Sequence, residues 1–400
     1  MPERSGPSFE FTNEQKLLLE QVDRVCAEVR PTEDCCYIEH RQNTAVKEKF
    51  ADAHLLGLPV SSQYGDGQGT DMLTYALALE RIGREGTSVR TFFSGHISLG
   101  MLTIQKYGDP QQRDEFLTPG TRGERVFAFG LTEPGAGSDP ASLTTSFEET
   151  TGGFVINGQK MWISNGSIAD SVIIFAYPKG KKEGMCAFVV DADSDGFSAQ
   201  PIENKMGLFS SDTATIHLED CPASKDALLG PPGRGLSVAY SALMSGRLSV
   251  AAGCVGVMRD CLDEAVRYSS IRVQHGKLIG KHQLVQRHIG IIAVNLEAAR
   301  WLTLQSAWLY QKHLDNPRDA SLRTEADVAI ARAKLFAAES SFDAANRAVQ
   351  VFGANGYSVE NRPARHLLDT RVCQIYEGTN EILEQKIAVS LLGKDFESYS

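Results

Sequence analysis

The sequence Gly230-Pro231-Pro232-Gly233 separates two parts of the chain that differ in pattern. Before it, from about residue 125, short β-branched and aromatic runs are bounded by turn residues, which is typical of an all-β unit. After it, residues 236–269, 283–314 and 320–352 show the apolar periodicity of long helices. Because such helices bury their apolar faces most economically against one another, we expect an antiparallel bundle. The breaker sequence therefore predicts a domain boundary.

The β unit, residues 125–235, is too long for a hairpin and predicts a small barrel or sandwich. Tight turns are expected at Gly152-Gly153, Asn157-Gly158 and Asn165-Gly166, where Gly or Asn can supply a positive φ angle. The runs expected to form strands are residues 126–131, 154–156, 160–163, 172–177, 186–190 and 213–218.

The N-terminal part of the chain has helical patterns that are separated by Gly-rich breaks. Its first helix is expected to start at a capping box formed by Thr12 and Gln15 and to end at Pro31. Further helices are expected at residues 45–55, 71–82, 90–107 and 110–117. The predicted fold is α+β, with a helical domain at residues 1–124, a β domain at 125–235 and a helical bundle at 236–400.

The composition excludes several classes of protein. The 400-residue chain has 40 Lys and Arg residues against 50 Asp and Glu residues, a formal net charge of −10, which argues against nucleic-acid binding. Residues 1–10 do not resemble a secretory signal, and we expect no apolar run long enough to cross a membrane. The expected location is the cytoplasm. The eight cysteines show no C-x-x-C pair and no Cys/His cluster, so neither a metal site nor a disulfide framework is predicted.

Two segments could carry chemistry, while the common nucleotide and hydrolase motifs are absent. Residues 132–139 offer hydroxyls and small residues that would let a ligand approach the backbone, although the segment could also be an ordinary turn. Residues 375–382 place Glu377 between Tyr376 and Gly378. A carboxylate in such a tight, apolar setting has a raised pKa, as a general base near neutral pH requires. The alternative is that Glu377 caps a helix.

Five motifs together resemble the acyl-CoA dehydrogenase family, in the same order and over nearly the whole chain. They are TEPGAGSD (132–139), NGQKMWISNG (157–166), Arg272-x-Gln274-x-Gly276, QVFGANG (350–356) and IYEGTNEI (375–382). The resemblance implies an N-terminal helical domain, a middle β-barrel domain and a C-terminal four-helix bundle. It also implies that the chain binds FAD and transfers electrons to an electron-transfer flavoprotein.

The resemblance also implies which residues bind FAD. His275 stands where phenylalanine is usual, and Ala354 replaces a common glycine. A second subunit is expected to complete each site, so the chain would form a homodimer or homotetramer. The expected FAD residues are Phe129, Leu131, Thr132, Ser138, Trp162, Ser164, Thr379 and Glu381 of one subunit, with Arg272, His275, Gln350, Gly353 and Ala354 of its neighbour.

The resemblance makes Glu377 the catalytic base, which would take the α-proton of an acyl thioester while the β-hydride passes to flavin N5. The product would be a trans-2-enoyl thioester. Some relatives carry the base on a bundle helix just before an arginine, but here that position is Gly246, before Arg247. Residues expected to contact the substrate are Arg90, Ser94, Ser138, Arg247, Tyr376 and Gly378.

The substrate class remains open at this point. Arg90 and Ser94 resemble residues by which glutaryl-CoA dehydrogenases bind a distal carboxylate, which favours a short or dicarboxylic acyl group. The alternative is that Arg90 lies on the surface at a helix start. Met244 replaces an aspartate that contacts pantetheine in many relatives, so an acyl-carrier-protein thioester is an alternative to acyl-CoA. Further alternatives are a flavin oxidase or monooxygenase and an inactive scaffold without flavin.

Overall fold

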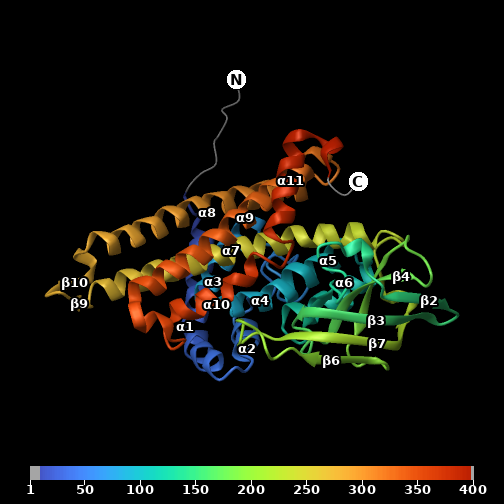
Figure 1. Cartoon of the computed structure of the whole chain (residues 1–400). Coiled ribbons are helices and arrows are strands. Elements are labelled where there is room, and N and C mark those ends of the chain that lie inside the picture. The colour runs from blue at the N-terminus through green and yellow to red at the C-terminus, as the bar shows by residue number, and fades with distance from the viewer. Residues whose placement is uncertain (1–9, 398–400) are drawn as a thin grey trace.

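The computed structural model describes residues 10–397. Figure 1 shows the strands of the large sheet at one end of the molecule, the short strands β9 and β10 at the other, and the long helices α7, α8 and α9 between them. The expected order of helices, sheet and helices is confirmed. The expectation that residues 1–10 form no secretory signal concerns a segment that, except for Glu10, lies outside the described residues.

The first N-terminal helix continues beyond Pro31, the residue at which it was predicted to end. Thr12 and Gln15 form the expected capping box, with Gln15 N donating to Thr12 Oγ1 at 3.1 Å. The prediction that Pro31 ends this helix is wrong: the last turns bury Cys36 and Tyr37, and this packing outweighs the loss of one backbone hydrogen bond. The helices are α1 (Asn13–Ile38), α2 (Ala45–Asp52), α3 (Met72–Glu85), α4 (Thr87–Phe93), α5 (Leu102–Tyr107) and α6 (Pro110–Thr121).

The single helix predicted for residues 90–107 is in fact three segments. Between α4 and α5 lies a π-helix, η1 (Ser94–Met101), whose wider turn re-aims the side chains of this stretch. Seven of its eight residues are buried, and Ser245 Oγ on α7 donates to the carbonyl oxygen of Ser98 at 2.6 Å. Ser94 is therefore placed in the interior, against α7.

Strands β1 to β8 form one sheet in the order β6-β7-β3-β2-β4-β5-β8, with β1 parallel to β4. The described residues show no pairing between the terminal strands β6 and β8, so this path is open. Three strands of this sheet, β2, β6 and β8, were not predicted. The strands are β1 (Phe127–Gly130), β2 (Ser146–Thr150), β3 (Gly153–Ser164), β4 (Ser171–Pro178), β5 (Cys186–Asp191), β6 (Phe197–Pro201), β7 (Thr213–Ser224) and β8 (Leu228–Leu229).

The turn predicted at Asn157-Gly158 is wrong. β3 continues through it, with bulges between Ile156 and Gly158 and again between Lys160 and Ile163. Gly158 is needed because a Cβ there would lie 2.7 Å from Cα of Thr145. The glycine therefore marks a close approach of two backbone segments rather than a reversal of the chain.

The C-terminal part is a bundle around the central helix α7 (Gly235–Ser269). α8 (Gln283–Asp315) and α9 (Ala320–Phe352) match their predictions to within one residue. A short hairpin, β9 (Val273–Gln274) with β10 (Lys277–Leu278), joins α7 to α8. Two shorter helices, α10 (Arg362–Cys373) and α11 (Asn380–Leu392), follow α9.

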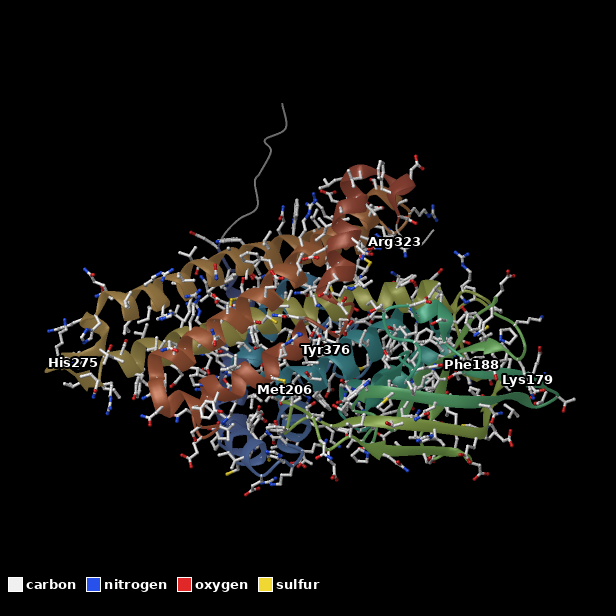
Figure 2. The ribbon with its side chains drawn as sticks, in the orientation of Figure 1. Lys179, Phe188, Met206, His275, Arg323 and Tyr376 are labelled. Atoms are coloured by element: carbon white, nitrogen blue, oxygen red, sulfur yellow. The ribbon has the colours of Figure 1, made fainter. Side chains whose placement is uncertain are left out.

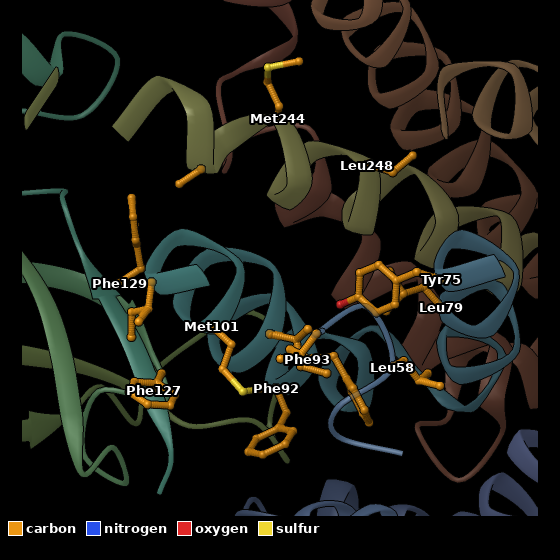
Figure 3. Packing of buried hydrophobic residues seen from close by; sticks show 14 of the residues in the cluster. Leu58, Tyr75, Leu79, Phe92, Phe93, Met101, Phe127, Phe129, Met244 and Leu248 are labelled. Carbon is orange, nitrogen blue, oxygen red and sulfur yellow. The ribbon is translucent and has the colours of Figure 1, made fainter. Parts of the chain in front are cut away.

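The expectation that the chain has no apolar run long enough to cross a membrane is corrected by α7. By length and composition this helix could cross a membrane, whereas no such apolar run was expected. In the folded chain 94% of its most apolar 18-residue window is buried, as in a core helix. Met244 and Leu248 of α7 belong to the same cluster of buried apolar residues as Phe129 of β1 and Tyr75 of α3, part of which is drawn in Figure 3. α7 therefore packs against the N-terminal helices, the sheet and the other helices of the bundle.

Candidate active site

Residues 374–379 form a loop that joins α10 to α11. Glu377 and Gly378 have φ angles of 57° and 90°, so two successive residues lie in the left-handed region. Such a conformation is costly for glutamate and persists only where the surroundings enforce it. Thr379 is the N-cap of α11 and its Oγ1 accepts from Ile382 N at 3.4 Å. Glu377 is therefore not the helix-capping acid that one interpretation of the sequence allowed.

Two basic side chains hold the loop from opposite helices. Arg247 Nε on α7 donates to the carbonyl oxygen of Glu377 at 2.7 Å. Lys334 Nζ on α9 donates to the carbonyl oxygen of Gly378 at 2.8 Å and to Asn380 Oδ1 at 3.2 Å. The two consecutive peptide carbonyls of the left-handed turn are thus tied to the bundle.

The side chain of Glu377 lies against Gly246. A Cβ built on Gly246 would be 2.5 Å from Oε1 and 2.7 Å from Cδ of Glu377, so glycine leaves the space that the carboxylate fills. Oε2 is buried without a hydrogen-bond partner in the described part of the chain. Burial raises the pKa of Glu377 to about 7, although the positive charges of Arg247, Arg90 and Lys334 act to lower it. The group can therefore gain and lose a proton near neutral pH.

Arg90 is also buried. The alternative that it is a surface residue is wrong, since it is 1% exposed. Its Nη1 donates to Ser94 Oγ at 2.7 Å. Its Nη2 donates to Thr91 Oγ1 at 3.2 Å and to Tyr376 OH. Ser94 Oγ in turn donates to Ser249 Oγ at 2.9 Å. Within residues 10–397 no carboxylate forms an ion pair with Arg90. A buried cation whose partners are hydroxyls is costly, and a bound anion would offset that cost.

On the sheet side, the segment after β1 is a turn with an open outer face. Glu133 and Ala136 exchange backbone hydrogen bonds of 3.0 and 3.1 Å, so the turn interpretation of residues 132–139 is correct in geometry. A Cβ on Gly135 or Gly137 would meet nothing within 4 Å. Exposed Ser138 lies beside these glycines. The segment therefore presents backbone and hydroxyl groups that a bulky ligand can approach.

A buried ion pair fixes this turn to β3. Lys160 Nζ lies 2.8 Å from Glu133 Oε1, and Met161 N donates to the carbonyl oxygen of Thr132 at 2.9 Å. Burial by itself would raise the pKa of Glu133, but the charge and hydrogen bond of Lys160 outweigh it and hold that pKa at about 2. Next to Lys160, Trp162 has a φ angle of 64° and is 55% exposed. An exposed indole beside the open turn fits a flat aromatic cofactor.

Family models for the acyl-CoA dehydrogenase N-terminal, middle and C-terminal domains match residues 12–124, 128–221 and 233–392. A probable acyl-CoA dehydrogenase of Bacillus subtilis is 34% identical over 394 residues, covering 96% of this chain and 100% of that protein. The chain belongs to the acyl-CoA dehydrogenase family. The expected fold, with N-terminal, middle and C-terminal family domains, is thereby confirmed.

Solved acyl-CoA dehydrogenase structures superpose on the chain. Butyryl-CoA dehydrogenase from Megasphaera elsdenii matches with a TM-score of 0.90 and 31% identity, covering 97% of this chain and 100% of that one. A glutaryl-CoA dehydrogenase from Mycobacterium smegmatis, solved in complex with FADH2, matches with a TM-score of 0.88 and 26% identity, covering 98% and 97%. The likeness therefore extends over whole chains.

In this acyl-CoA dehydrogenase fold the expected FAD residues form two separate groups. Phe129, Trp162 and Ser164 lie in strands β1 and β3, Leu131, Thr132 and Ser138 in the segment after β1, and Thr379 and Glu381 at the start of α11. The others gather at the hairpin end of the bundle, where Tyr268 stacks on Phe352 at 4.2 Å and accepts from Asn355 Nδ2 at 2.9 Å. Figure 2 shows His275 at that end, well away from Tyr376 in the middle. One chain does not bring Arg272, His275, Gln350, Gly353 and Ala354 to Glu377.

Several residues of the site were missed in the sequence. For Lys334 the sequence offers one weak indication of a special role, since it is a lone cation in the apolar run 333–338 of a long helix. Ser249 and Asn380 gave none, because their roles depend on helices that are distant in sequence. Gly246 was noted as the absence of an alternative base, whereas its structural role is to leave room for Glu377.

Gly246→Ala tests where the carboxylate lies. The new methyl group should push the flexible end of Glu377 aside and lower kcat about 10²-fold, while the melting temperature stays close to that of the wild type because alanine favours helix. Gly290→Ala on α8 is the control, since a Cβ there meets nothing within 4 Å. Measuring kcat and Tm for both variants decides the point, and an unaltered kcat in Gly246→Ala would contradict this placement of Glu377.

Proposed function

We propose that this chain is an FAD-dependent dehydrogenase that converts an acyl thioester to its trans-2-enoyl thioester, with Glu377 as the base. The observation that carries the proposal is the buried Glu377 carboxylate, which has an unpartnered oxygen, a space provided by Gly246 and a pKa of about 7. A base with these properties can accept the weakly acidic α-proton of a thioester at neutral pH.

The loop also offers a donor for the thioester carbonyl. The backbone N–H of Glu377 donates to no acceptor in the described segment, residues 10–397. Arg247 and Lys334 hold the two peptides that follow this N–H, through the carbonyl oxygens of Glu377 and Gly378, and so limit the movement of the residue that carries it. A preorganised N–H of this kind stabilises negative charge on the carbonyl oxygen as the α-proton leaves.

FAD, when bound, supplies the acceptor for the β-hydride. We propose that Trp162 packs on the flavin, that the open turn holding Thr132 and Ser138 lies along the flavin and its phosphates, and that Phe129, Leu131, Ser164, Thr379 and Glu381 line the remainder. Because Arg272 and the residues near it lie at the other end of the bundle, a second subunit would have to supply them. The proposed assembly is therefore a homodimer or homotetramer, with an electron-transfer flavoprotein as the electron acceptor.

For the substrate, we propose a short or dicarboxylic acyl group. Arg90 and Ser94 support the dicarboxylic class, because the guanidinium is buried among hydroxyls and no acid of the described chain forms an ion pair with it. We propose that Tyr376, Gly378, Arg247 and Ser138 also line the substrate site. Met244, which is 1% exposed, offers no hydrogen bond to a pantetheine arm, so a carrier-protein thioester is tested beside CoA.

The test is anaerobic bleaching of the visible flavin absorbance by a panel of monocarboxylic and dicarboxylic acyl-CoAs and the matching acyl-carrier-protein thioesters. We expect rapid bleaching by one class. Its rate should rise as the pH increases through about 7, because Glu377 accepts a proton only in its ionised form and its pKa lies there.

The other outcomes separate the alternatives. Flavin that stays oxidised with every thioester would contradict the proposed dehydrogenation. Fast reoxidation of the bleached protein in air would favour an oxidase or monooxygenase. Protein that cannot take up FAD would favour the inactive scaffold.

A further inference from the structure

Lys334 is a buried cation without a carboxylate partner. It lies in the middle of α9 and is fully buried. None of the described acidic side chains lies within ion-pair distance of its Nζ. Its hydrogen-bond acceptors are the carbonyl oxygen of Gly378, in the 374–379 loop, at 2.8 Å, and Oδ1 of Asn380, the first residue of α11, at 3.2 Å. Burying an ammonium group costs free energy, and here these two oxygens accept its hydrogen bonds.

The groups that face Lys334 come from every element packed around it. Arg247 and Cys254 face it from α7, Cys373 from α10, and Glu377 from the loop. Glu339 of α9 lies further along, 3.5 Å from Asn380 Nδ2. The carboxylate of Glu377 is thus the acid of the catalytic loop that this cation can influence, and the influence favours its ionised form.

We infer that Lys334 is a positioning residue for the base: from α9 it holds the left-handed turn at Glu377 and Gly378 in place. The inference rests on the proposed role of Glu377. Arg247 holds the preceding carbonyl from α7, so the two helices fix two successive peptides. Without Lys334, one of these peptides is free to rotate and the neighbouring carboxylate loses a positive charge.

The reason to expect a kinetic effect is geometric. The left-handed conformation of Glu377 is unfavourable for a residue with a side chain, so it depends on the contacts that enforce it. A small displacement of the carboxylate or of the Glu377 N–H lowers the rate of proton abstraction more than it lowers substrate affinity. A side chain that served packing alone would change stability and leave the ionisation of Glu377 unaltered.

The experiment compares Lys334→Met and Lys334→Arg with the wild type, as FAD-loaded full-length protein. Arg332→Met is the control, because it removes an exposed cation from the same helix, two residues away. Two readouts are used. The first is the pH profile of kcat and KM. The second is a pH titration of the infrared band of the protonated Glu377 carboxyl group, which is assigned by its loss in Glu377→Gln and needs no turnover.

For Lys334→Met we expect kcat to fall about 10²-fold with a much smaller change in KM. The acidic side of the pH profile and the infrared titration should both move to higher pH, since removing the cation disfavours the ionised carboxylate. Lys334→Arg keeps the charge and should restore the infrared titration, with only part of kcat because the fork does not match the ammonium contacts. Arg332→Met should match the wild type.

Two results would overturn the inference. One is a Lys334→Met protein that titrates like the wild type and keeps its kcat. The other is a lower melting temperature with no shift in either pH readout, which would mean a purely structural role. A wild type that bleaches with no thioester but whose infrared titration moves in Lys334→Met would reject the proposed reaction and leave the positioning role standing.

Discussion

Glu377→Gln is expected to lower kcat by about 10³-fold or more. Glutamine has the same shape and fits the space that Gly246 leaves, but its amide cannot accept the α-proton. The loop should keep its conformation, because the contacts of Arg247 and Lys334 are made to backbone carbonyls and not to the Glu377 side chain. FAD content and melting temperature should therefore stay close to the wild-type values.

The measurement is the rate of anaerobic flavin bleaching by the best substrate of the panel, followed by rapid mixing. Glu384→Gln is the matched control, since it removes an exposed acid from α11 close to the same loop. It should bleach at the wild-type rate. A Glu377→Gln protein that retained a tenth or more of the wild-type bleaching rate would rule out Glu377 as the base.

Arg90→Met is expected to reduce kcat/KM for dicarboxylic acyl thioesters by about 10²-fold or more, because a desolvated carboxylate would lose its charged partner. For short monocarboxylic thioesters the loss should be smaller, since they bring no second charge; the part of the loss that both classes share comes from Glu377, whose pKa the charge of Arg90 lowers. Folding stability should not fall, because an apolar side chain of similar length replaces a buried cation without an acidic partner in the described chain.

Two further variants sharpen this test. Arg90→Lys keeps the charge but loses the planar fork, so it should recover only part of the dicarboxylic activity. Gly253→Ala leaves Arg90 in the sequence but places a Cβ 2.9 Å from its Cδ, so the guanidinium must move and the dicarboxylic preference should weaken. Equal losses for monocarboxylic and dicarboxylic substrates in Arg90→Met would reject Arg90 as the specificity residue.

The long helices and five of the eight strands of the sheet could be predicted because they depend on local patterns. Residues 320–352 form α9 as expected, since an apolar periodicity without Gly or Pro has few other ways to fold. The errors arose where tertiary packing overrode a local signal. Pro31 does not stop α1, because burial of Cys36 and Tyr37 stabilises the turns beyond it, and Gly158 lies within β3, because Thr145 approaches its backbone.

The sequence by itself determined the family, the order of the domains and the identity of Glu377 as the candidate base, because each of these is carried by a contiguous motif. Tertiary structure decided what surrounds that base. Arg247 and Lys334 contact the loop from 130 and 44 residues away, and Arg90 reaches Tyr376 across 286 residues. Burial, the pKa of about 7 and the space at Gly246 arise only when these distant helices pack together, because desolvation and charge depend on neighbours in space rather than in sequence.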